Sequence, residues 1–224
     1  VFRRGDSAKV VVAYDVALRK ELDSITVWGA LALAPDEHSP VISSTDSAER
    51  RGAMSVMVLP QPHVVSLEVI DTVAHRGAAW SRSVVSITPL KPGEIAISDP
   101  LLYDPGEEEI GDLESAMRTA VGSNTIKRGK IGLYWEMYGL AQSDSTRPIS
   151  LTLTRINQGA LRKLGESMGL TSRMSPLKIQ WNQFATGMIA SRSIALDLTQ
   201  IPRGRYLLRI DAGGAATSKE IVID

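Results

Sequence analysis

One short segment of the sequence has the residue types of a hydrolase nucleophile. Gly165-Glu166-Ser167-Met168-Gly169 matches the pattern Gly-x-Ser-x-Gly, in which the serine occupies a sharp turn between a buried strand and a helix. The preceding residues, Leu161-Arg162-Lys163-Leu164, are not those of a buried strand. In α/β-hydrolases the catalytic histidine follows the nucleophile, whereas every histidine of this chain precedes Ser167. A serine hydrolase using Ser167 is therefore the third of our hypotheses, and a helix end capped by glycine is the favoured interpretation.

The residues that could hold a metal ion or a cofactor are few and poorly spaced. The chain has no cysteine, and His38, His63 and His75 show neither a His-x-His nor a His-x-x-x-His pattern. The acidic run 107–109, with Asp104 and Asp112 nearby, offers the oxygen ligands that calcium prefers, but it lacks the spacing of an EF-hand loop. No glycine-rich phosphate loop occurs. We therefore expect no catalytic residues, no metal and no cofactor.

The composition excludes several classes of partner. The 25 Lys and Arg residues balance 25 Asp and Glu residues, and a protein that binds nucleic acid by neutralising phosphates normally carries a basic excess. No apolar run reaches the length of about eighteen residues that a membrane span needs. The absence of cysteine is compatible with export from a bacterial cell. We expect a folded protein without nucleic-acid partners and without a direct membrane span.

Short β-like runs separated by turn residues fill both halves of the chain. In segments such as Ile149–Thr154, apolar and hydroxyl residues alternate, so that one face must be covered by a second sheet. About seven strands in each half, at a spacing of roughly ten residues, predict two tandem immunoglobulin-like β-sandwiches in an all-β protein. The predicted strands are Ala8–Val16, Ile25–Ala34, Val41–Ser44, Met54–Pro60, Val64–Asp71, Trp80–Thr88, Ile95–Tyr103, Thr125–Arg128, Gly132–Tyr138, Ile149–Ile156, Leu177–Gln183, Ser193–Thr199, Tyr206–Asp211 and Glu220–Ile223.

The boundary between the two sandwiches is predicted near Asp104–Glu109, where Pro-Gly is followed by three adjacent glutamates that cannot be buried together. This divides the chain into a first domain over 1–105, a linker over 106–123 and a second domain over 124–224. The linker contains a short predicted helix, Asp112–Ala120.

The long connection Asn157–Ser175 is the first candidate for a partner-binding surface. A sandwich hairpin normally needs two to five residues, and longer connections usually have a function or are disordered. Within it, Gly159–Gly169 is predicted to form a short amphipathic helix or a long loop over the edge of the second sandwich. Its apolar residues either close a sheet edge of their own domain or dock on another subunit inside a rim of cations. The candidate contact residues are Leu161, Arg162, Lys163, Leu164, Met168, Arg173 and Met174.

A second candidate surface follows from one aromatic strand. Tyr134 and Tyr138 share a face of the predicted strand Gly132–Tyr138, and Trp135 points to the other face. If the tyrosine face is exposed, it forms an aromatic patch suited to a protein partner. For each of the four tryptophans, packing within a sandwich is the default expectation.

Four segments together resemble a known family. Val1-Phe2-Arg3-Arg4-Gly5-Asp6, Glu94–Asp99, Lys130–Leu140 and Gly204–Ile210 look, in this order, like the β-rich C-terminal region of exported bacterial proteins known as GWxTD-domain-containing proteins. The Gly-Trp-x-Thr-Asp motif itself does not occur in these 224 residues. The resemblance implies export and a β architecture, and it implies no reaction and no catalytic residues.

Three hypotheses for function follow. The first is a non-catalytic structural or protein-binding subunit of a larger envelope assembly, in the periplasm or outside the cell, that acts through protein contacts. One setting for it is the periplasmic face of a membrane complex, for example a photosynthetic reaction centre with its light-harvesting ring. The second is a carbohydrate-binding sandwich module, because exposed tryptophan and tyrosine side chains stack on sugars. The third is the hydrolase that would use Ser167.

Overall fold

The computed structural model describes residues 1–15, 27–35, 41–48, 51–71, 76–84, 89–91, 94–106, 110–140, 146–156, 176–184 and 188–224. Strands dominate these residues, and the described part holds one α-helix of six residues. The predicted all-β class with two immunoglobulin-like sandwiches is confirmed. Nearly every predicted strand is present, with shifts of a few residues at the ends.

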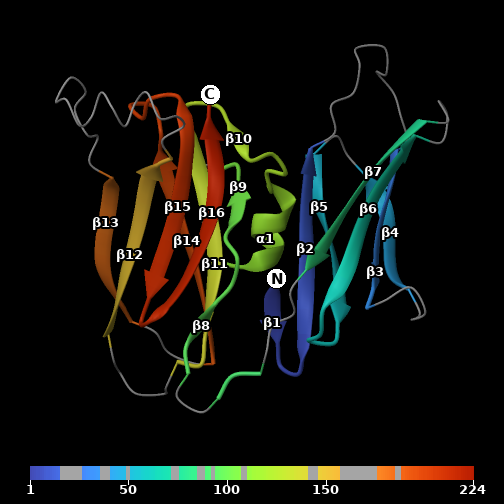
Figure 1. Cartoon of the computed structure of the whole chain (residues 1–224), viewed down its shortest axis with the longest axis horizontal. Helices are drawn as coiled ribbons and strands as arrows, with labels where there is room; N and C mark the ends of the chain where they lie inside the picture. Colours follow the sequence, from blue (N-terminus) through green and yellow to red (C-terminus); the bar gives the residue numbers. More distant parts are fainter. Residues whose placement is uncertain are drawn as a thin grey trace.

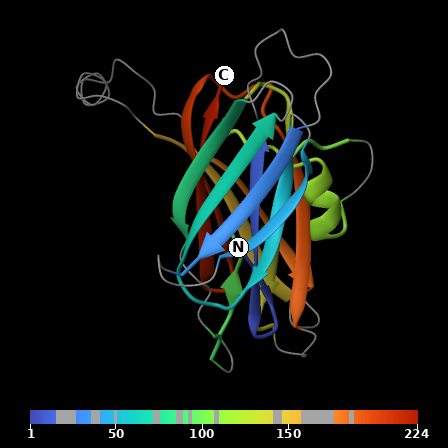
Figure 2. The same ribbon diagram turned by 90° about the vertical axis from the view of Figure 1, so that its right-hand side faces the viewer.

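The first sandwich is built from two antiparallel sheets, β1-β2-β5 and β4-β3-β6-β7. Its core lies between them, where Leu31 and Leu33 of one sheet meet Ala8 and Val10 of the other. Figure 2 looks onto sheet β4-β3-β6-β7, which lies in front of the remaining layers. The strands are β1 (Phe2–Arg4), β2 (Ser7–Asp15), β3 (Val27–Ala34), β4 (Ile42–Ala48), β5 (Arg51–Val58), β6 (His63–Asp71) and β7 (Arg76–Val84).

The second sandwich pairs a five-stranded sheet, β10-β16-β15-β12-β13, with a smaller sheet in which β11 pairs with β14, β8 and β9. Alternation creates its core, since Ile149, Leu151 and Leu153 of β12 are all buried. The elements are β8 (Ala96–Ile97), β9 (Leu101–Tyr103), α1 (Leu113–Arg118), β10 (Thr125–Ile126), β11 (Lys130–Tyr138), β12 (Thr146–Arg155), β13 (Leu177–Phe184), β14 (Ile189–Asp197), β15 (Gly204–Ala212) and β16 (Ala215–Ile223).

Both sandwiches follow one strand order. In the first, the first, second and fifth strands form one sheet, and the fourth, third, sixth and seventh form the other. The second sandwich repeats this order if β8 and β9 count as its first strand, and β10 is an addition beside β16. The chain is therefore an architectural repeat, although its halves show no sequence repeat that we can detect.

The two sandwiches lie face to face, with α1 between them (Figure 1). A third cluster of buried side chains joins them and includes Phe2 of β1, Leu113 and Ala116 of α1, and Tyr134 of β11. Val11 and Ala13 of β2 pack against this cluster, so sheet β1-β2-β5 contributes to packing on both of its faces. The predicted helix is present, and the Asp112 carboxylate caps it by accepting a hydrogen bond of 2.7 Å from the Ser115 backbone N–H.

The structure differs from the sequence prediction in two places at this boundary. Strands β8 and β9 fall inside the range predicted for the first domain, 1–105, but both pair with β11 of the second sandwich. The change of partner therefore comes before Ala96, because a short strand belongs to the sheet that completes its hydrogen bonds. Strand β1, which was not predicted, forms a hairpin with β2 through Gly5 at a φ of 61°.

Candidate functional site

The candidate face of Tyr134 and Tyr138 is not exposed. Their side chains are 0% and 3% exposed, and they lie against β1 of the same chain. All residues of β11 after Lys130 are buried, because one face meets the core of its own sandwich and the other meets the first sandwich. The prediction of an aromatic patch for an external partner at these two residues is therefore wrong. Their partner is the other half of the chain.

A buried carboxylate lies at the centre of this contact. Glu136, between the two tyrosines on β11, is 2% exposed. The Arg4 guanidinium donates to both of its oxygens, with Nη1 to Oε2 at 2.6 Å and Nη2 to Oε1 at 2.9 Å. The hydroxyls of Tyr134 and Tyr138 donate to Oε1 and Oε2, each at 2.9 Å. Four donors from three side chains thus surround one carboxylate, which meets the requirement for burying a charge.

The electrostatics of this cluster favour a structural role. Burial, reinforced by the Glu136 charge, raises the pKa of both phenols, so Tyr134 and Tyr138 stay protonated and keep donating. The hydrogen bond to Glu136 raises the pKa of Arg4. A carboxylate that already accepts four hydrogen bonds is poorly placed to take a proton from a substrate. The cluster therefore joins the sandwiches, and it is not arranged as an acid–base site.

Further contacts fix the same boundary. Lys9 of β2 forms an ion pair with Glu114 of α1. A Cβ atom built on Gly122 would lie 2.2 Å from the Tyr14 carbonyl carbon, so this segment approaches the β2 backbone as closely as a residue without a side chain permits. Arg51 lies 3.6 Å from both Asp15 and Asp104, but these partly exposed pairs contribute little.

The opposite face of β11 borders a hollow of about 320 Å³ in the second sandwich. Two indole rings line it, Trp135 from one sheet and Trp181 from the other, with ring centres 6.4 Å apart and an interplanar angle of 63°. Ile179, Arg192, Ser193 and Ile194 complete its lining. Sequence reasoning placed both tryptophans in strands, but it could not show that a hollow lies between them.

A second, wider hollow of about 690 Å³ lies over the ends of β12, β13 and β15. Its polar lining includes Arg147, Asn182 and Asp211. A sugar site of the usual kind needs an exposed aromatic face beside such groups. Trp181 borders this hollow but is only partly exposed, and Trp80, exposed to 46%, belongs to β7 of the other sandwich. At this hollow the described residues therefore offer no exposed aromatic platform of the kind that the carbohydrate hypothesis needs.

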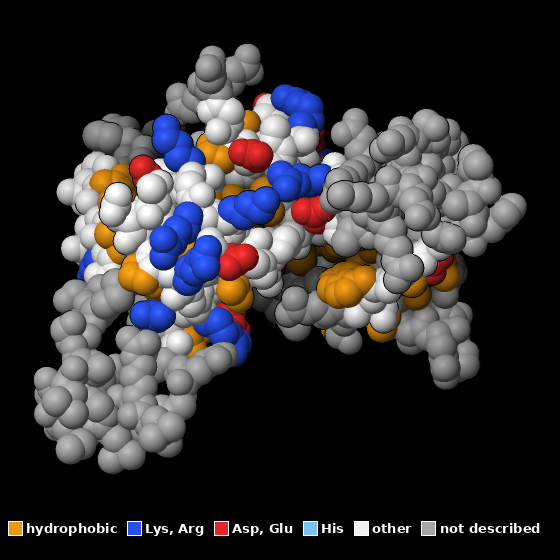
Figure 3. Space-filling model, turned by 90° about the horizontal axis from the view of Figure 1, so that it is seen from above, with side chains coloured by type: hydrophobic (Ala, Val, Ile, Leu, Met, Phe, Trp, Pro, Cys, Tyr) orange, Lys and Arg blue, Asp and Glu red, His pale blue; other side chains and the backbone are white. Residues whose placement is uncertain are grey.

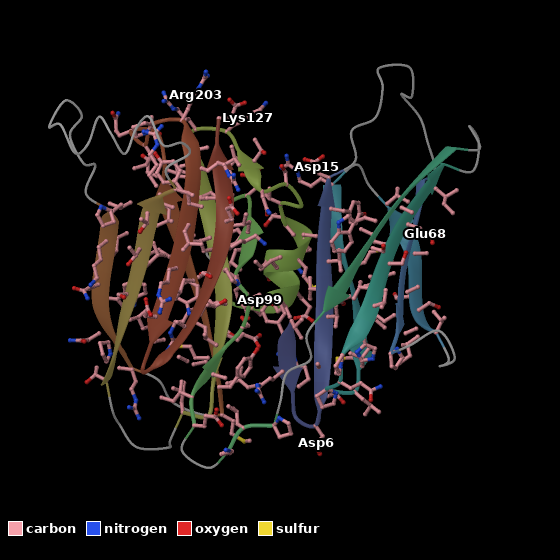
Figure 4. The ribbon with its side chains drawn as sticks, in the orientation of Figure 1. Asp6, Asp15, Glu68, Asp99, Lys127 and Arg203 are labelled. Atoms are coloured by element: carbon pink, nitrogen blue, oxygen red, sulfur yellow. The ribbon has the colours of Figure 1, made fainter. Side chains whose placement is uncertain are left out.

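Positive side chains gather at one end of the second sandwich. Figure 3, seen from the end where Figure 4 labels Lys127 and Arg203, shows Lys and Arg side chains clustered there. The segment that carries Lys127 and Arg128 meets the end of the chain after β16, since the Arg128 backbone N–H donates to the Asp224 carbonyl oxygen at 3.2 Å. Lys127, Arg128 and Arg203 are exposed and form no ion pair with another described residue. We call these three residues the basic end.

Most other candidates lie outside the described residues. This applies to Ser167, His38, His75, the acidic run 107–109 and the whole connection 157–175 with its seven candidate contact residues. His63 is buried, and its Nδ1 lies 2.6 Å from the Gln61 carbonyl oxygen. In the part of the chain that the structure describes, no three metal-binding side chains group together, and no helix is long and apolar enough to cross a membrane.

Comparisons with known proteins give structural likeness alone. No family model matches the sequence, and no curated protein matches it. An immunoglobulin-like protein from Pseudomonas aeruginosa is similar at 14% identity and a TM-score of 0.37, over 59% of this chain and 98% of that one. The FN1–FN3 domains of chicken CNTN1 are similar at 9% identity and a TM-score of 0.29, over 96% of this chain and 61% of that one. At this level the comparisons carry no argument about function.

Proposed function

We propose that the chain is a non-catalytic binding subunit whose two joined sandwiches present the basic end of the second sandwich to an acidic protein surface. The observation that carries the proposal is the exposure of Lys127, Arg128 and Arg203 without a described ion-pair partner. Unpaired cations on one surface steer an acidic partner during encounter and give specificity more than raw affinity.

The described residues that flank the long connection support the same end of the molecule. The backbone N–H of Ile156, the last described residue before 157–175, donates to the Arg205 carbonyl oxygen at 2.8 Å. Beyond the connection, Leu177 of β13 is in register with Leu153 of β12. The described residues on either side of the connection, Ile156 and Leu177, therefore lie close to the basic end. Its sequence carries three more cations, Arg162, Lys163 and Arg173, together with the apolar candidate residues.

The buried cluster at Glu136 supports a scaffold role for the first sandwich. A charge surrounded by four donors from both halves stabilises one relative arrangement of the two sandwiches and disfavours alternatives. The resemblance to exported GWxTD-domain-containing proteins leads us to place this scaffold in the bacterial envelope. The finer part of the proposal is attachment to the periplasmic face of a membrane complex, with a photosynthetic reaction centre and its light-harvesting ring as the first assembly to examine.

The test is purification of the tagged protein from its own membranes under mild detergent. The variant Lys127→Glu/Arg128→Glu/Arg203→Glu is compared with the control Lys91→Glu/Lys178→Glu, which reverses two exposed charges elsewhere. We expect one set of acidic partners to accompany the wild type and the control, to be lost with the variant, and to dissociate as salt is raised. Partners retained equally by all three proteins, or enzymatic turnover by the purified chain, would contradict the proposal.

A further inference from the structure

Among the described residues, one side of the second sandwich, between β13 and β14, is left open. Strand β13 ends the five-stranded sheet, and β14 ends the sheet that faces it. Among the described strands, β13 pairs only with β12, and β14 pairs only with β11. Each strand therefore has one edge whose backbone N–H and C=O groups no other described strand uses. Such an edge is a template for a further strand.

Between these two edges lies the hollow lined by Trp135 and Trp181. The two indoles and Ile179 and Ile194 give it apolar walls. Its volume of about 320 Å³ equals roughly ten water molecules at about 30 Å³ each, which is room for a large side chain and not for a folded domain. The opening is thus matched in size to one residue of an inserted chain.

One polar group in the hollow lacks an acceptor. Trp135 is 0% exposed, and its Nε1 atom has no hydrogen-bond partner among the described residues. Leaving a buried donor without an acceptor is unfavourable, so an acceptor brought by a ligand gains more here than it would on an open surface. This observation is independent of the open strand edges, and it indicates a ligand that carries oxygen.

The charge of the lining indicates which oxygen. Arg192 is in register with Trp135 across the β11–β14 pair, so both side chains belong to the same face. No acidic side chain lines the hollow. Burial lowers the pKa of Arg192, as expected for a guanidinium partly removed from water. Its Nη1 already donates to the Ser191 carbonyl oxygen at 2.6 Å, and a carboxylate of a ligand beside the guanidinium would add a charge-assisted hydrogen bond.

We propose that the open side of the second sandwich binds an extended, acidic segment of a partner protein, which adds as a strand to the free edge of β14. One aliphatic side chain of the segment fills the hollow against Trp135 and Trp181. A carboxylate two residues away, on the same face of the added strand, accepts from the Trp135 Nε1–H and contacts Arg192, which is in register with Trp135. The recognised pattern is therefore aliphatic-x-acidic within an extended stretch.

Strand β14 is the receiving edge for two reasons. It supplies half of the lining, Arg192, Ser193 and Ile194, so a chain beside it runs along the mouth of the hollow. Apolar side chains are also exposed where it begins, since Met188 is 80% and Ile189 42% exposed. An added strand would cover part of this apolar surface, which is otherwise exposed to water.

The probe is a nine-residue peptide in which threonines flank a central isoleucine-threonine-aspartate sequence. Its control carries asparagine instead of aspartate. Binding to the full chain is followed by the change in tryptophan fluorescence at peptide concentrations up to about 1 mM. Amide hydrogen exchange then locates the contact. We expect slower exchange at β14, Ile189–Asp197, and at least tenfold weaker binding of the asparagine peptide.

Two variants make the test specific. Arg192→Glu should weaken binding of the acidic peptide at least tenfold, and Trp181→Ala should weaken both peptides equally. Lys178→Glu, on the outward face of β13, should change neither. The thermal transition of each variant shows whether it has folded. If Arg192→Glu or Trp181→Ala has not, the comparison of the aspartate and asparagine peptides on the wild-type chain still tests the carboxylate contact.

Three results would overturn the proposal. The first is the absence of saturable binding by either peptide. The second is slow exchange at β14 in the free protein that depends on protein concentration, which would identify a second copy of the chain as the occupant. The third is concentration-independent slow exchange at the outer edge of β14 without peptide, which would mean that the chain covers this edge itself. None of these outcomes bears on the basic end, because the two surfaces share no residue.

Discussion

Replacing Arg4 by leucine removes two of the four hydrogen bonds to a carboxylate that is 2% exposed. The Tyr134 and Tyr138 hydroxyls remain as donors, but no positive side chain of another described residue remains within hydrogen-bond distance of Glu136. The substitution therefore leaves a negative charge buried between the two sandwiches with half of its donors. We expect the first effect on the contact between β1 and β11.

The magnitude follows from the burial of the pair. Breaking a buried ion pair by removing one partner costs about 3–5 kcal/mol. Arg4 keeps 27% of its side chain exposed, so water can reach the vacated position, and the lower value, about 3 kcal/mol, applies. In a chain of 224 residues this corresponds to a decrease in melting temperature of about 6–12 °C, at about 2–4 °C per kcal/mol.

The assay is urea denaturation of Arg4→Leu, Glu136→Leu and the double variant, followed by circular dichroism. If the pair is coupled as described, the double variant loses less stability than the sum of the two single losses, because no uncompensated charge remains in it. A loss below about 0.5 kcal/mol for Arg4→Leu, or strict additivity of the two losses, would refute the assignment of Glu136 as a buried charge held by both halves.

Three further perturbations test the same boundary. Burial raises the pKa of Tyr134 and Tyr138 above the unfolded value of 10.0, so their contribution to stability is complete below pH 10 and falls at higher pH. Above pH 10 the free energy of unfolding should therefore fall by about 1.4 kcal/mol per pH unit for each tyrosine, and the double change to phenylalanine should remove this dependence in alkaline denaturation. Gly122→Ala places a Cβ atom against the Tyr14 backbone and should cost about 1–3 kcal/mol in urea, whereas a wild-type midpoint would disprove the close approach. Asp112→Ala removes the cap of α1 and should cost about 1 kcal/mol, with Asp112→Asn retaining most of it.

Much of the fold could be predicted from the sequence because period-two alternation is a local signal. The alternating residues Ile149, Leu151 and Leu153 predict one apolar strand face that packs against a second sheet, and all three are buried in the structure. The helix at α1 was equally predictable, since Asp112 is a favoured capping residue and Leu113 and Met117 share one side. In both cases a few neighbouring residues decide the outcome.

The boundary and the candidate surfaces required information that is not local. Alternation showed that Tyr134 and Tyr138 share a face, but whether that face meets water or a second domain depends on β1, more than 130 residues away in sequence. The same limit placed β8 and β9 in the wrong half, because two and three residues are too few to indicate their pairing partner. A single glutamate within the otherwise uncharged run Ile131–Tyr138 was the available signal for the cluster at Glu136.

The face-to-face contact also determines the order in which the chain can mature during synthesis. Arg4 is synthesised 132 residues before Glu136, so the first sandwich emerges while Phe2, Val11 and Ala13 are not yet covered by the second. Contacts between residues so distant in sequence form slowly, and apolar faces that are exposed until these contacts form are prone to aggregation. We therefore expect newly made protein to depend on a holding chaperone until the last strands close. For the same reason, neither half should be transplantable into another protein as an independent module.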